Sequence, residues 1–302
     1  MNEVVTPLIS VVIPTYNHAQ YLGRALQSVV DQTYTNWEAI VIDNHSSDNT
    51  DDVMASYTDP RITYLKIHNN GIIAASRNAG ILEAKGEWIA FLDSDDLWYR
   101  GKLQTAIDAI RCDYSIDVCC NDELQVDALR NHRMTLDYGP YCTNFYRELL
   151  LKGNRLSTSA TLVKREFMTK RAILFRENKE FVTVEDYDFW MLLAWAGANF
   201  KFIKSIQGEY TIHATNASSQ LDRHRQSLIN VVKDHVYNLQ TFQQDKDRLW
   251  HYINAGLLIS SAKNMFENKH YVSSIKCLIT AFCGSSVGTL SYILAKLSKS
   301  FK

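Results

Sequence analysis

Four short apolar runs separate amphipathic stretches in the first hundred residues. The runs are bounded by turn residues and rich in β-branched or aromatic side chains, which predicts β-strands over residues 8–14, 37–43, 62–67 and 87–92. Apolar residues recur at helical spacing in residues 18–32 and 72–85, between the strands. Helices between successive apolar strands predict an α/β fold with a mostly parallel nucleotide-binding sheet flanked by helices.

Polar residues gather directly after three of these strands. Residues 14–17 (Pro-Thr-Tyr-Asn) follow the first strand, Asp43 and Asn44 end the second, and residues 93–95 (Asp-Ser-Asp) follow the fourth. Ligands of open α/β sheets bind beyond the carboxyl ends of the strands, so we expect these clusters to meet at one edge of the sheet.

Three aspartates within four positions, Asp93, Asp95 and Asp96, would repel one another in a compact structure. A divalent cation removes this repulsion, and Mg²⁺ or Mn²⁺ commonly links carboxylates to substrate phosphates. The alternative is a solvated acidic turn that caps a helix. The position directly after a buried strand, with two other polar strand ends nearby, favours the cation.

Two segments carry a family resemblance. Residues 9–50 (ISVVIPTYNHAQYLGRALQSVVDQTYTNWEAIVIDNHSSDNT) resemble the opening of the family 2 glycosyltransferases. Residues 71–96 (GIIAASRNAGILEAKGEWIAFLDSDD) resemble their next block, which ends in a metal-binding Asp-x-Asp motif. The resemblance extends over residues 8–215. It implies the A-type nucleotide-sugar transferase fold and transfer of a sugar from a nucleotide-diphosphate donor, with inversion at the anomeric carbon.

The resemblance also implies roles for residues of the sugar-donor half. Pro14 and Tyr16 would flank the base pocket, and Asp43 and Asn44 would contact uracil or ribose. Arg77 would lie near the donor diphosphate. Asp93 would contact the ribose, and Asp95 together with Asp93 would bind the metal. The family usually has Asp-Asp-Gly-Ser where residues 43–46 read Asp-Asn-His-Ser. An amide at Asn44 still pairs with a pyrimidine. We therefore expect a UDP-sugar, with a dTDP-sugar left open, and helix capping is the alternative role of Asp43 and Asn44.

An acidic cluster in the second half precedes an apolar helix. Glu185 and Asp186 match a Glu-Asp pair of the family, which implies Asp186 as the general base and Glu185 as its neighbour. An acceptor hydroxyl must lose its proton as it attacks the anomeric carbon, and a nearby carboxylate can take that proton. The alternative is that these acidic residues only cap the helix.

Other matches concern the metal and the acceptor side. Residues 210–219 (YTIHATNASS) resemble the family's Tyr-x-x-His-x-x-Asn-x-Ser segment, which implies that His213 binds the metal or the diphosphate; a packed or surface histidine is the alternative. Residues 155–167 resemble the strand and helix that line the acceptor side, with hydroxyl contacts expected from residues 157–159. The polar, irregular interval 121–145 is expected to form a loop over the cleft.

The chain reads as helices from about residue 220. We therefore expect a catalytic domain at residues 1–219, with a nucleotide-sugar half (1–100) and an acceptor half (101–219), and a helical C-terminal extension at 220–302. Residues 268–302 contain five lysines and no acidic residue. Glycine and serine near residues 284–286 disfavour a spanning helix and predict two amphipathic helices, which either lie on an anionic membrane leaflet or pack on the catalytic domain.

Composition sets the remaining limits. Of the 302 residues, 46% are hydrophobic and 22% are charged, and the net charge of −1 argues against a nucleic-acid partner. The six cysteines lack regular spacing and are expected to be buried thiols of a reducing cytosol. No signal peptide is visible, so we expect a cytoplasmic location, at the inner face of the cell membrane if the tail binds lipid.

The sequence favours a metal-dependent glycosyltransferase that uses Mn²⁺ or Mg²⁺ and acts on a glycan or lipid-linked acceptor, and it leaves two alternative functions. A sugar nucleotidyltransferase would have a GxGxR-type loop after the first strand, and residues 14–23 (PTYNHAQYLG) lack it. A non-catalytic sugar-nucleotide-binding scaffold would have lost Asp95 or Asp186, and both are present.

Overall fold

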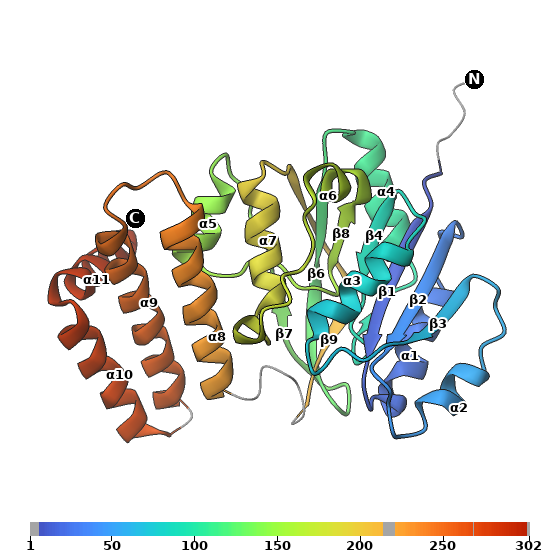
Figure 1. Cartoon of the computed structure of the whole chain (residues 1–302), viewed down its shortest axis with the longest axis horizontal. Coiled ribbons are helices and arrows are strands. Elements are labelled where there is room, and N and C mark those ends of the chain that lie inside the picture. Colours follow the sequence, from blue (N-terminus) through green and yellow to red (C-terminus); the bar gives the residue numbers. More distant parts are fainter. Residues whose placement is uncertain (1–5, 214–220, 268, 301–302) are drawn as a thin grey trace. The chain divides into compact units, whose positions relative to one another are not determined.

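The computed structural model describes residues 6–213, 221–267 and 269–300 (Figure 1). The chain divides into two compact units, Met1–Leu149 with Asn154–Ser219 and Leu150–Gly153 with Gln220–Lys302. Within the described residues, the first unit holds a nine-stranded sheet and the second is helical.

The sheet of the first unit is parallel at one side and mixed at the other. In chain order its strands are β1 (Ile9–Thr15), β2 (Trp37–Asp43), β3 (Ile62–Lys66), β4 (Trp88–Phe91), β5 (Leu97–Trp98), β6 (Val118–Asp127), β7 (His132–Leu136), β8 (Thr161–Lys164) and β9 (Phe200–Ile212). The strand order is β3-β2-β1-β4-β8-β6-β9-β5, with β7 paired to β6. Pairing is parallel from β3 to β4 and between β6 and β9, and antiparallel elsewhere. The expected α/β fold is confirmed, and its parallel part is the predicted nucleotide-binding half.

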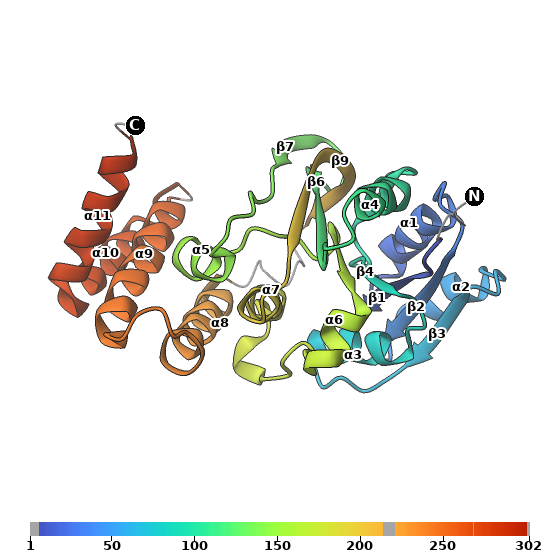
Figure 2. The same cartoon turned by 90° about the horizontal axis from the view of Figure 1, so that it is seen from above.

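Helices cover both faces of this sheet. In chain order the helices up to residue 195 are α1 (Ala19–Val30), α2 (Thr50–Ala55), α3 (Ile73–Glu83), α4 (Lys102–Cys112), α5 (Phe145–Lys152), α6 (Arg165–Arg171), the 3₁₀ turn η1 (Lys179–Phe181) and α7 (Glu185–Trp195), and the end of α5 belongs to the second unit. Figure 2 shows α1 and α4 on one face of the sheet and α3 and α6 on the other.

Strand alternation explains the two-sided burial. Odd-numbered residues of β1 and β2, such as Val11 and Val41, and even-numbered residues of β4, such as Ala90, pack with the apolar stripes of α1 and α4 in one core cluster. The alternate residues, such as Val12 of β1 and Phe91 of β4, are equally buried on the opposite face. Strands buried on both faces read as continuous apolar runs, which is why these four strands were predictable from the sequence.

Residues 118–136 correct one expectation. We expected a loop over the cleft at 121–145, but its first part forms a β-hairpin of β6 and β7. The polar start of β6 is buried: Asn121 accepts a hydrogen bond from the ammonium of Lys102, and Glu123 accepts one from the hydroxyl of Tyr138 at 2.9 Å. Polar residues whose partners lie in other elements form a strand here, and the sequence pattern alone does not reveal those partners.

The second unit is built of helices. They are α8 (Leu221–Asp234), the π-helical turn η3 (His235–Leu239), α9 (Lys246–Glu267), α10 (Tyr271–Gly284) and α11 (Ser286–Ser300). Close contacts join the last three: the hydroxyl of Ser274 on α10 donates to the carbonyl of Ala262 on α9 at 2.7 Å. The hydroxyl of Thr289 on α11 donates to the carbonyl of Ala281 on α10 at 2.8 Å. The predicted break between two C-terminal helices lies at Ser285, between α10 and α11.

Neither α10 nor α11, nor any other single helix of the described residues, is long and apolar enough to cross a membrane by itself. The pair Tyr271–Gly284 and Ser286–Lys296 meets the length and composition criteria jointly but is bent by 112°.

The cysteines correct a second expectation. All six are free, but only Cys119, Cys120 and Cys277 are buried, whereas Cys112 and Cys283 are exposed. Both exposed thiols lie on helices, on the solvent side of α4 and at the end of α10.

Candidate active site

The carboxyl ends of the parallel strands meet at one edge of the sheet, as the sequence predicts. Thr15, Asp43 and Lys66 lie side by side in the register of β1, β2 and β3. The acidic loop that contains Asp93 and Asp95 follows β4, which pairs with β1. The sheet therefore brings the predicted sugar-donor residues to a common edge.

Asp93 and Asp95 point to different positively charged or hydrogen-bonding partners. The Oδ1 atom of Asp93 lies 2.8 Å from Nη2 of Arg77. The Oδ2 atom of Asp95 lies 2.8 Å from Nε2 of His213. Separate partners relieve part of the repulsion that the sequence places in this loop.

The third aspartate of the loop, Asp96, is fully enclosed. It accepts hydrogen bonds from the hydroxyl of Ser159 and from the backbone N–H of Thr211. Burial, reinforced by the neighbouring Asp95 carboxylate, raises the pKa of Asp96 well above its usual value. Burial therefore favours the neutral form of Asp96, which lessens the repulsion within the acidic loop.

Ser159 has a different role from the acceptor contact expected for residues 157–159. Its side chain is fully buried, donates to Asp96 and accepts the backbone N–H of Asp93 at 3.0 Å. The hydroxyl is used inside the protein to hold the acidic loop, so it does not face an acceptor.

Arg77 joins the acidic loop to the start of α7. Its side chain is 4% exposed, with Nη1 lying 2.7 Å from Oε1 of Glu185 and Nη2 bonded to Asp93. Both terminal nitrogens of the guanidinium are thus engaged by carboxylates. The chain segments that carry Arg77 and Glu185 are separated by 108 positions, so this link exists only in the folded protein.

Strained backbone precedes the Glu-Asp pair. Thr183 has φ of 84°, an outlier for a β-branched residue, and its N–H donates to Oε2 of Glu185 at 2.8 Å. Strain of this kind costs about 1–3 kcal/mol and persists where surrounding contacts impose it. Thr183 and Arg77 therefore fix the Glu185 carboxylate from two sides.

Asp186 lies in the first turn of α7, next to Glu185. Its Oδ2 accepts a long hydrogen bond of 3.3 Å from the side-chain amide of Asn154. Burial raises the pKa of Asp186 to about 7, and the neighbouring Glu185 carboxylate adds to the shift. A carboxyl group that titrates near neutral pH is suited to accept and release a proton.

Asp43 and Asn44 fix the loop after β2. Asp43 is fully buried and accepts hydrogen bonds from the N–H of Ser46 at 3.0 Å and from the hydroxyl of Tyr64 at 2.9 Å. The side-chain oxygen of Asn44 accepts the N–H of Asn69 at 2.9 Å. These contacts tie together the loops that follow β2 and β3.

Neither residue caps the next helix, because α2 begins at Thr50 with Asn49 at its N-cap position. Pro14 is buried within β1, and the side chain of Tyr16 is 53% exposed at the sheet edge. His45, which stands where the family usually has glycine, has φ of 53° and stacks on His68 at 3.8 Å between ring centroids.

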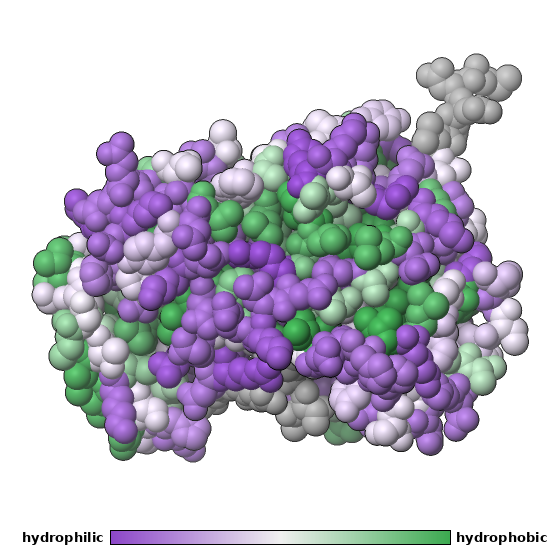
Figure 3. All heavy atoms as spheres, in the orientation of Figure 1, coloured by the Kyte–Doolittle hydropathy of each residue, from purple (hydrophilic) through white to green (hydrophobic). Residues whose placement is uncertain are grey.

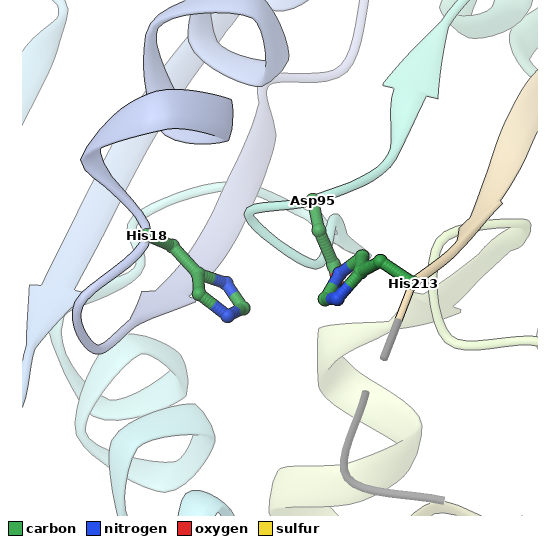
Figure 4. Close-up of side chains that lie close together, drawn as sticks. All are labelled: His18, Asp95 and His213. Atoms are coloured by element: carbon green, nitrogen blue, oxygen red, sulfur yellow. The ribbon is translucent and has the colours of Figure 1, made fainter. Parts of the chain in front are cut away.

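One group of side chains in the described residues has the chemistry and spacing to hold a metal ion: His18, Asp95 and His213, whose ligand atoms lie within 4.8 Å of one another (Figure 4). Asp95 and His213 were predicted as ligands, whereas Asp93 is not part of this group. His18 was missed, and its only signal was its place at the end of the polar segment after the first strand. Residues 214–219 of the predicted His213 segment lie outside the described residues.

The family model described as Glycosyl transferase family 2 matches residues 10–172. This chain belongs to glycosyl transferase family 2. The match covers the parallel half of the sheet, the acidic loop and the strand and helix β8 and α6.

Curated relatives of this glycosyltransferase span different lengths. It is 26% identical over 275 residues to UDP-Glc:alpha-D-GlcNAc-diphosphoundecaprenol beta-1,3-glucosyltransferase WfgD of Escherichia coli, covering 87% of this chain and 97% of WfgD. It is 27% identical over 238 residues to chondroitin synthase of E. coli, covering 77% of this chain but only 33% of that protein.

Solved structures show the same fold. S. aureus TarS 1–349 in complex with UDP-GlcNAc superimposes with a TM-score of 0.68 at 19% identity, covering 90% of this chain and 81% of that one. The mannosyltransferase PcManGT from Pyrobaculum calidifontis, in complex with GDP-Man and Mn²⁺, gives 0.62 at 17% identity, covering 99% and 82%. The glycosyltransferase therefore has the A-type fold that the sequence predicts.

Proposed function

We propose that this glycosyltransferase moves a sugar from a UDP-sugar, with inversion at the anomeric carbon, to a hydroxyl group of a lipid-linked or polysaccharide acceptor. The observation that carries the proposal is the Asp186 carboxyl, whose pKa is raised to about 7 and which is linked through Glu185 and Arg77 to the acidic loop after β4. The relative WfgD, which this chain covers almost completely, is named for UDP-Glc and a diphosphoundecaprenol-linked sugar.

Asp186 is the proposed general base. As the acceptor oxygen attacks the anomeric carbon from the face opposite the diphosphate, the carboxylate of Asp186 takes the hydroxyl proton. Glu185 and Asn154 orient it, because one adjoins it in the first turn of α7 and the other donates a hydrogen bond to it. Such a base contributes about 10²–10⁴-fold to the rate.

Arg77 is proposed to position two carboxylates rather than to bind the diphosphate directly as a free cation. Its ion pairs hold Asp93, the proposed ribose contact, and Glu185 in one buried unit. Breaking such a pair leaves an uncompensated buried charge, which is strongly destabilising. Through Arg77, the position of the acidic loop that contains Asp93 depends on the position of the start of α7, which carries Glu185 and Asp186.

The base pocket of the proposal lies at the ends of β1 and β2. Pro14 and Tyr16 flank the base, while Asp43 shapes the loop and Asn44 offers its amide NH₂ group to a pyrimidine carbonyl. The side-chain oxygen of Asn44 is already engaged by Asn69. Uracil and thymine share the ring carbonyl groups that Asn44 would contact. The assay with UDP-, dTDP- and GDP-sugars described below distinguishes a UDP-sugar from a dTDP-sugar.

A divalent cation, Mn²⁺ or Mg²⁺, fits the acidic loop. The fit rests on the donor set, since Asp95 offers a carboxylate oxygen and His213 an imidazole nitrogen 2.8 Å away, both in a group within 4.8 Å. We propose Asp95 and His213 as ligands, with Asp93 as an additional candidate. The bound cation supplies positive charge that stabilises the departing diphosphate.

The proposal includes contact with a membrane surface. Figure 3 shows apolar side chains over α10, the helix labelled in the same orientation in Figure 1. The exposed apolar residues of α10 and α11 are Tyr271, Val272, Ile275, Leu278, Ile279, Phe282, Val287, Leu290 and Leu294. Residues 268–302 carry only positive charge, which complements an anionic leaflet. We propose that this face lies on the inner leaflet of the cell membrane, where a lipid-linked acceptor is found.

The proposed reaction is tested with the full chain, Mn²⁺ and a panel of UDP-, dTDP- and GDP-sugars, by measuring nucleotide diphosphate release with and without a lipid-diphosphate-linked glycan. We expect release from a UDP-sugar, stimulated by the acceptor. Asp186→Asn should lower kcat by about 10²–10⁴-fold and leave the affinity for the UDP-sugar unchanged, because only the proton acceptor is removed.

Asp52→Asn is the matched control, since Asp52 is an exposed aspartate in the first turn of α2. It should behave as the wild type. Loss of UDP-sugar binding in Asp186→Asn, with turnover of the bound sugar donor retained, would place Asp186 in the sugar-donor site and contradict its role as base.

A further inference from the structure

We propose that His18 is a third protein ligand of the metal held by Asp95 and His213, and that this His₂Asp set prefers first-row transition ions to Mg²⁺. The inference deepens the proposed function and rests on it, because it concerns the same cation. It adds a ligand from the loop after β1 to a site otherwise formed by the acidic loop and the end of β9.

The local backbone presents His18 at the sheet edge. Asn17, just before it, has φ of 51°, a left-handed conformation that asparagine tolerates better than most residues, and this turns the chain into α1. The turn is held from the neighbouring loop: the N–H of Asn17 donates to the hydroxyl of Ser46, and the N–H of Ser47 donates to the side-chain oxygen of Asn17, both at 2.8 Å. His18 is thus placed before any ligand binds.

The imidazole of His18 is oriented by the middle residue of the acidic motif. Its Nδ1 lies 2.9 Å from the hydroxyl oxygen of Ser94, a side chain that is 3% exposed. When Nδ1–H donates to Ser94, the lone pair of Nε2 is available to a cation. Metal-binding histidines regularly donate their second ring N–H to a protein acceptor, which fixes the tautomer and the ring. The Asp-Ser-Asp motif therefore supplies both a metal ligand and the support of another.

Tyr21 holds the two histidines beside Asp95. Its ring stacks on His213 with 4.8 Å between centroids and an interplanar angle of 16°. It meets His18 edge-on at 5.7 Å and 84°. Side chains locked by packing in this way are characteristic of a prepared metal site.

The spacing suits closure on one ion. The three ligand atoms lie within 4.8 Å of one another. Ligands on opposite sides of an ion bound at about 2.1 Å are separated by about 4.2 Å, so a small movement of one side chain completes the set. The alternative is an Asp95–His213 hydrogen bond beside packed rings, and it predicts that His18 contributes nothing to metal affinity.

The donor set decides the class of metal. Mg²⁺ demands oxygen ligands and retains several waters, whereas imidazole nitrogen suits first-row transition ions. For a fixed N/O site, affinity rises from Mn²⁺ to Co²⁺. Two imidazoles with one carboxylate should therefore bind Co²⁺ more tightly than Mn²⁺, and both more tightly than Mg²⁺.

The test is direct metal binding to the full chain after removal of bound ions, with and without UDP. Mn²⁺ affinity is measured from the loss of the free-ion electron paramagnetic resonance signal, and ligand nitrogens are counted by electron spin echo modulation of the bound ion. We expect two histidine nitrogens on Mn²⁺ in the wild type and one in His18→Ala. We also expect at least an approximately tenfold loss of Mn²⁺ affinity in His18→Ala. His132→Ala, at an exposed histidine of β7, should change neither quantity.

The outcomes separate this inference from the proposed function. One histidine nitrogen on bound Mn²⁺ in the wild type would overturn the role of His18 and leave the Asp95–His213 site standing. Equal affinities for Mg²⁺ and Mn²⁺ would overturn the metal preference. Failure of the wild type to bind any of the three ions, with or without UDP, would overturn the proposed metal dependence itself. The nitrogen count on the wild type needs no variant, so a folding defect in His18→Ala does not affect it.

Discussion

At the scale of single residues, the environment of Asp186 bears most directly on its proposed role as the general base. Burial and the Glu185 carboxylate raise its pKa, and the Arg77 guanidinium opposes the shift. The balance brings the pKa to about 7, some three units above an ordinary aspartate. A base that titrates near the working pH is deprotonated often enough to act and is still basic enough to take a proton.

The first prediction at this scale is a pH profile. As the proposed base, Asp186 would act only when deprotonated, and its pKa is raised to about 7, so we expect activity above pH 7 that is lost as the pH falls through that value. We expect kcat/KM for the acceptor, at saturating UDP-sugar, to rise about tenfold per pH unit on the acid side and to level off near pH 7. The residual activity of Asp186→Asn should lack this acid limb. A limb at about pH 4, where an ordinary carboxyl titrates, would show that the active complex does not keep Asp186 in this environment.

Some residue roles could be predicted from the sequence and others could not. Asp95, His213, Glu185 and Asp186 lie in motifs whose order and local spacing are visible along the chain, and the structure brings Asp95 and His213 together. The confinement of Asp96 could not be predicted, because one of its partners is the backbone N–H of Thr211, 115 positions away. Contacts between residues so far apart in the sequence leave no local sequence pattern. A single histidine such as His18 likewise gives no sequence pattern from which metal binding could be predicted.

At the scale of elements, the approach of α3 to the sheet depends on one glycine. A Cβ atom at Gly80 would lie 2.4 Å from Cγ1 of Val12, a buried, β-branched side chain of β1 with little freedom to move. The absent side chain lets the helix that carries Arg77 lie close to β1, the strand that ends at the proposed sugar-donor site. Helix packing and active-site geometry are therefore connected through this contact.

We predict that Gly80→Ala lowers the free energy of unfolding by about 1–3 kcal/mol, because overpacking a close contact outweighs the better helix propensity of alanine. The midpoint of chemical denaturation measures the change. Gly23→Ala in α1 is the matched control, since its Cβ would lie 3.6 Å from Val53, an ordinary contact. That substitution should raise stability by about 0.5–1 kcal/mol. If both variants gained stability equally, the close approach of α3 to β1 would not be limiting.

The strands differ in how well they could be predicted from the sequence. The apolar runs of β1 to β4 specify buried parallel strands without help from distant residues, and β2 was predicted at its observed bounds. The start of β6 has the opposite character, because the buried side chains of Asn121 and Glu123 bond to Lys102 on α4 and to Tyr138 in the loop after β7. Tertiary partners, not local pattern, make that segment a strand.

At the scale of the whole molecule, the helical unit has a surface that the catalytic chemistry does not require. Exposed apolar residues recur on α10 at positions 272, 275, 279 and 282, which fall on one helical face. A contiguous exposed patch of this kind usually marks a binding surface. The charge of residues 268–302 is entirely positive, so an anionic lipid surface satisfies both its apolar and its electrostatic character.

We predict that the full chain sediments with vesicles containing anionic lipid at low salt, and less so at high salt, because salt screens the attraction of the lysines. The double variant Ile275→Glu with Ile279→Glu should lower the partition coefficient at least about tenfold, since it removes two apolar side chains and adds two charges repelled by the leaflet. Both side chains are more than half exposed, so the fold should be retained. Leu82→Glu, at a 74% exposed leucine of α3, is the control and should bind vesicles as the wild type does. Unchanged binding by the double variant would assign membrane attachment to another surface. If the double variant instead changed the self-association of the protein, measured by analytical ultracentrifugation without lipid, this face would be a contact between copies of this chain.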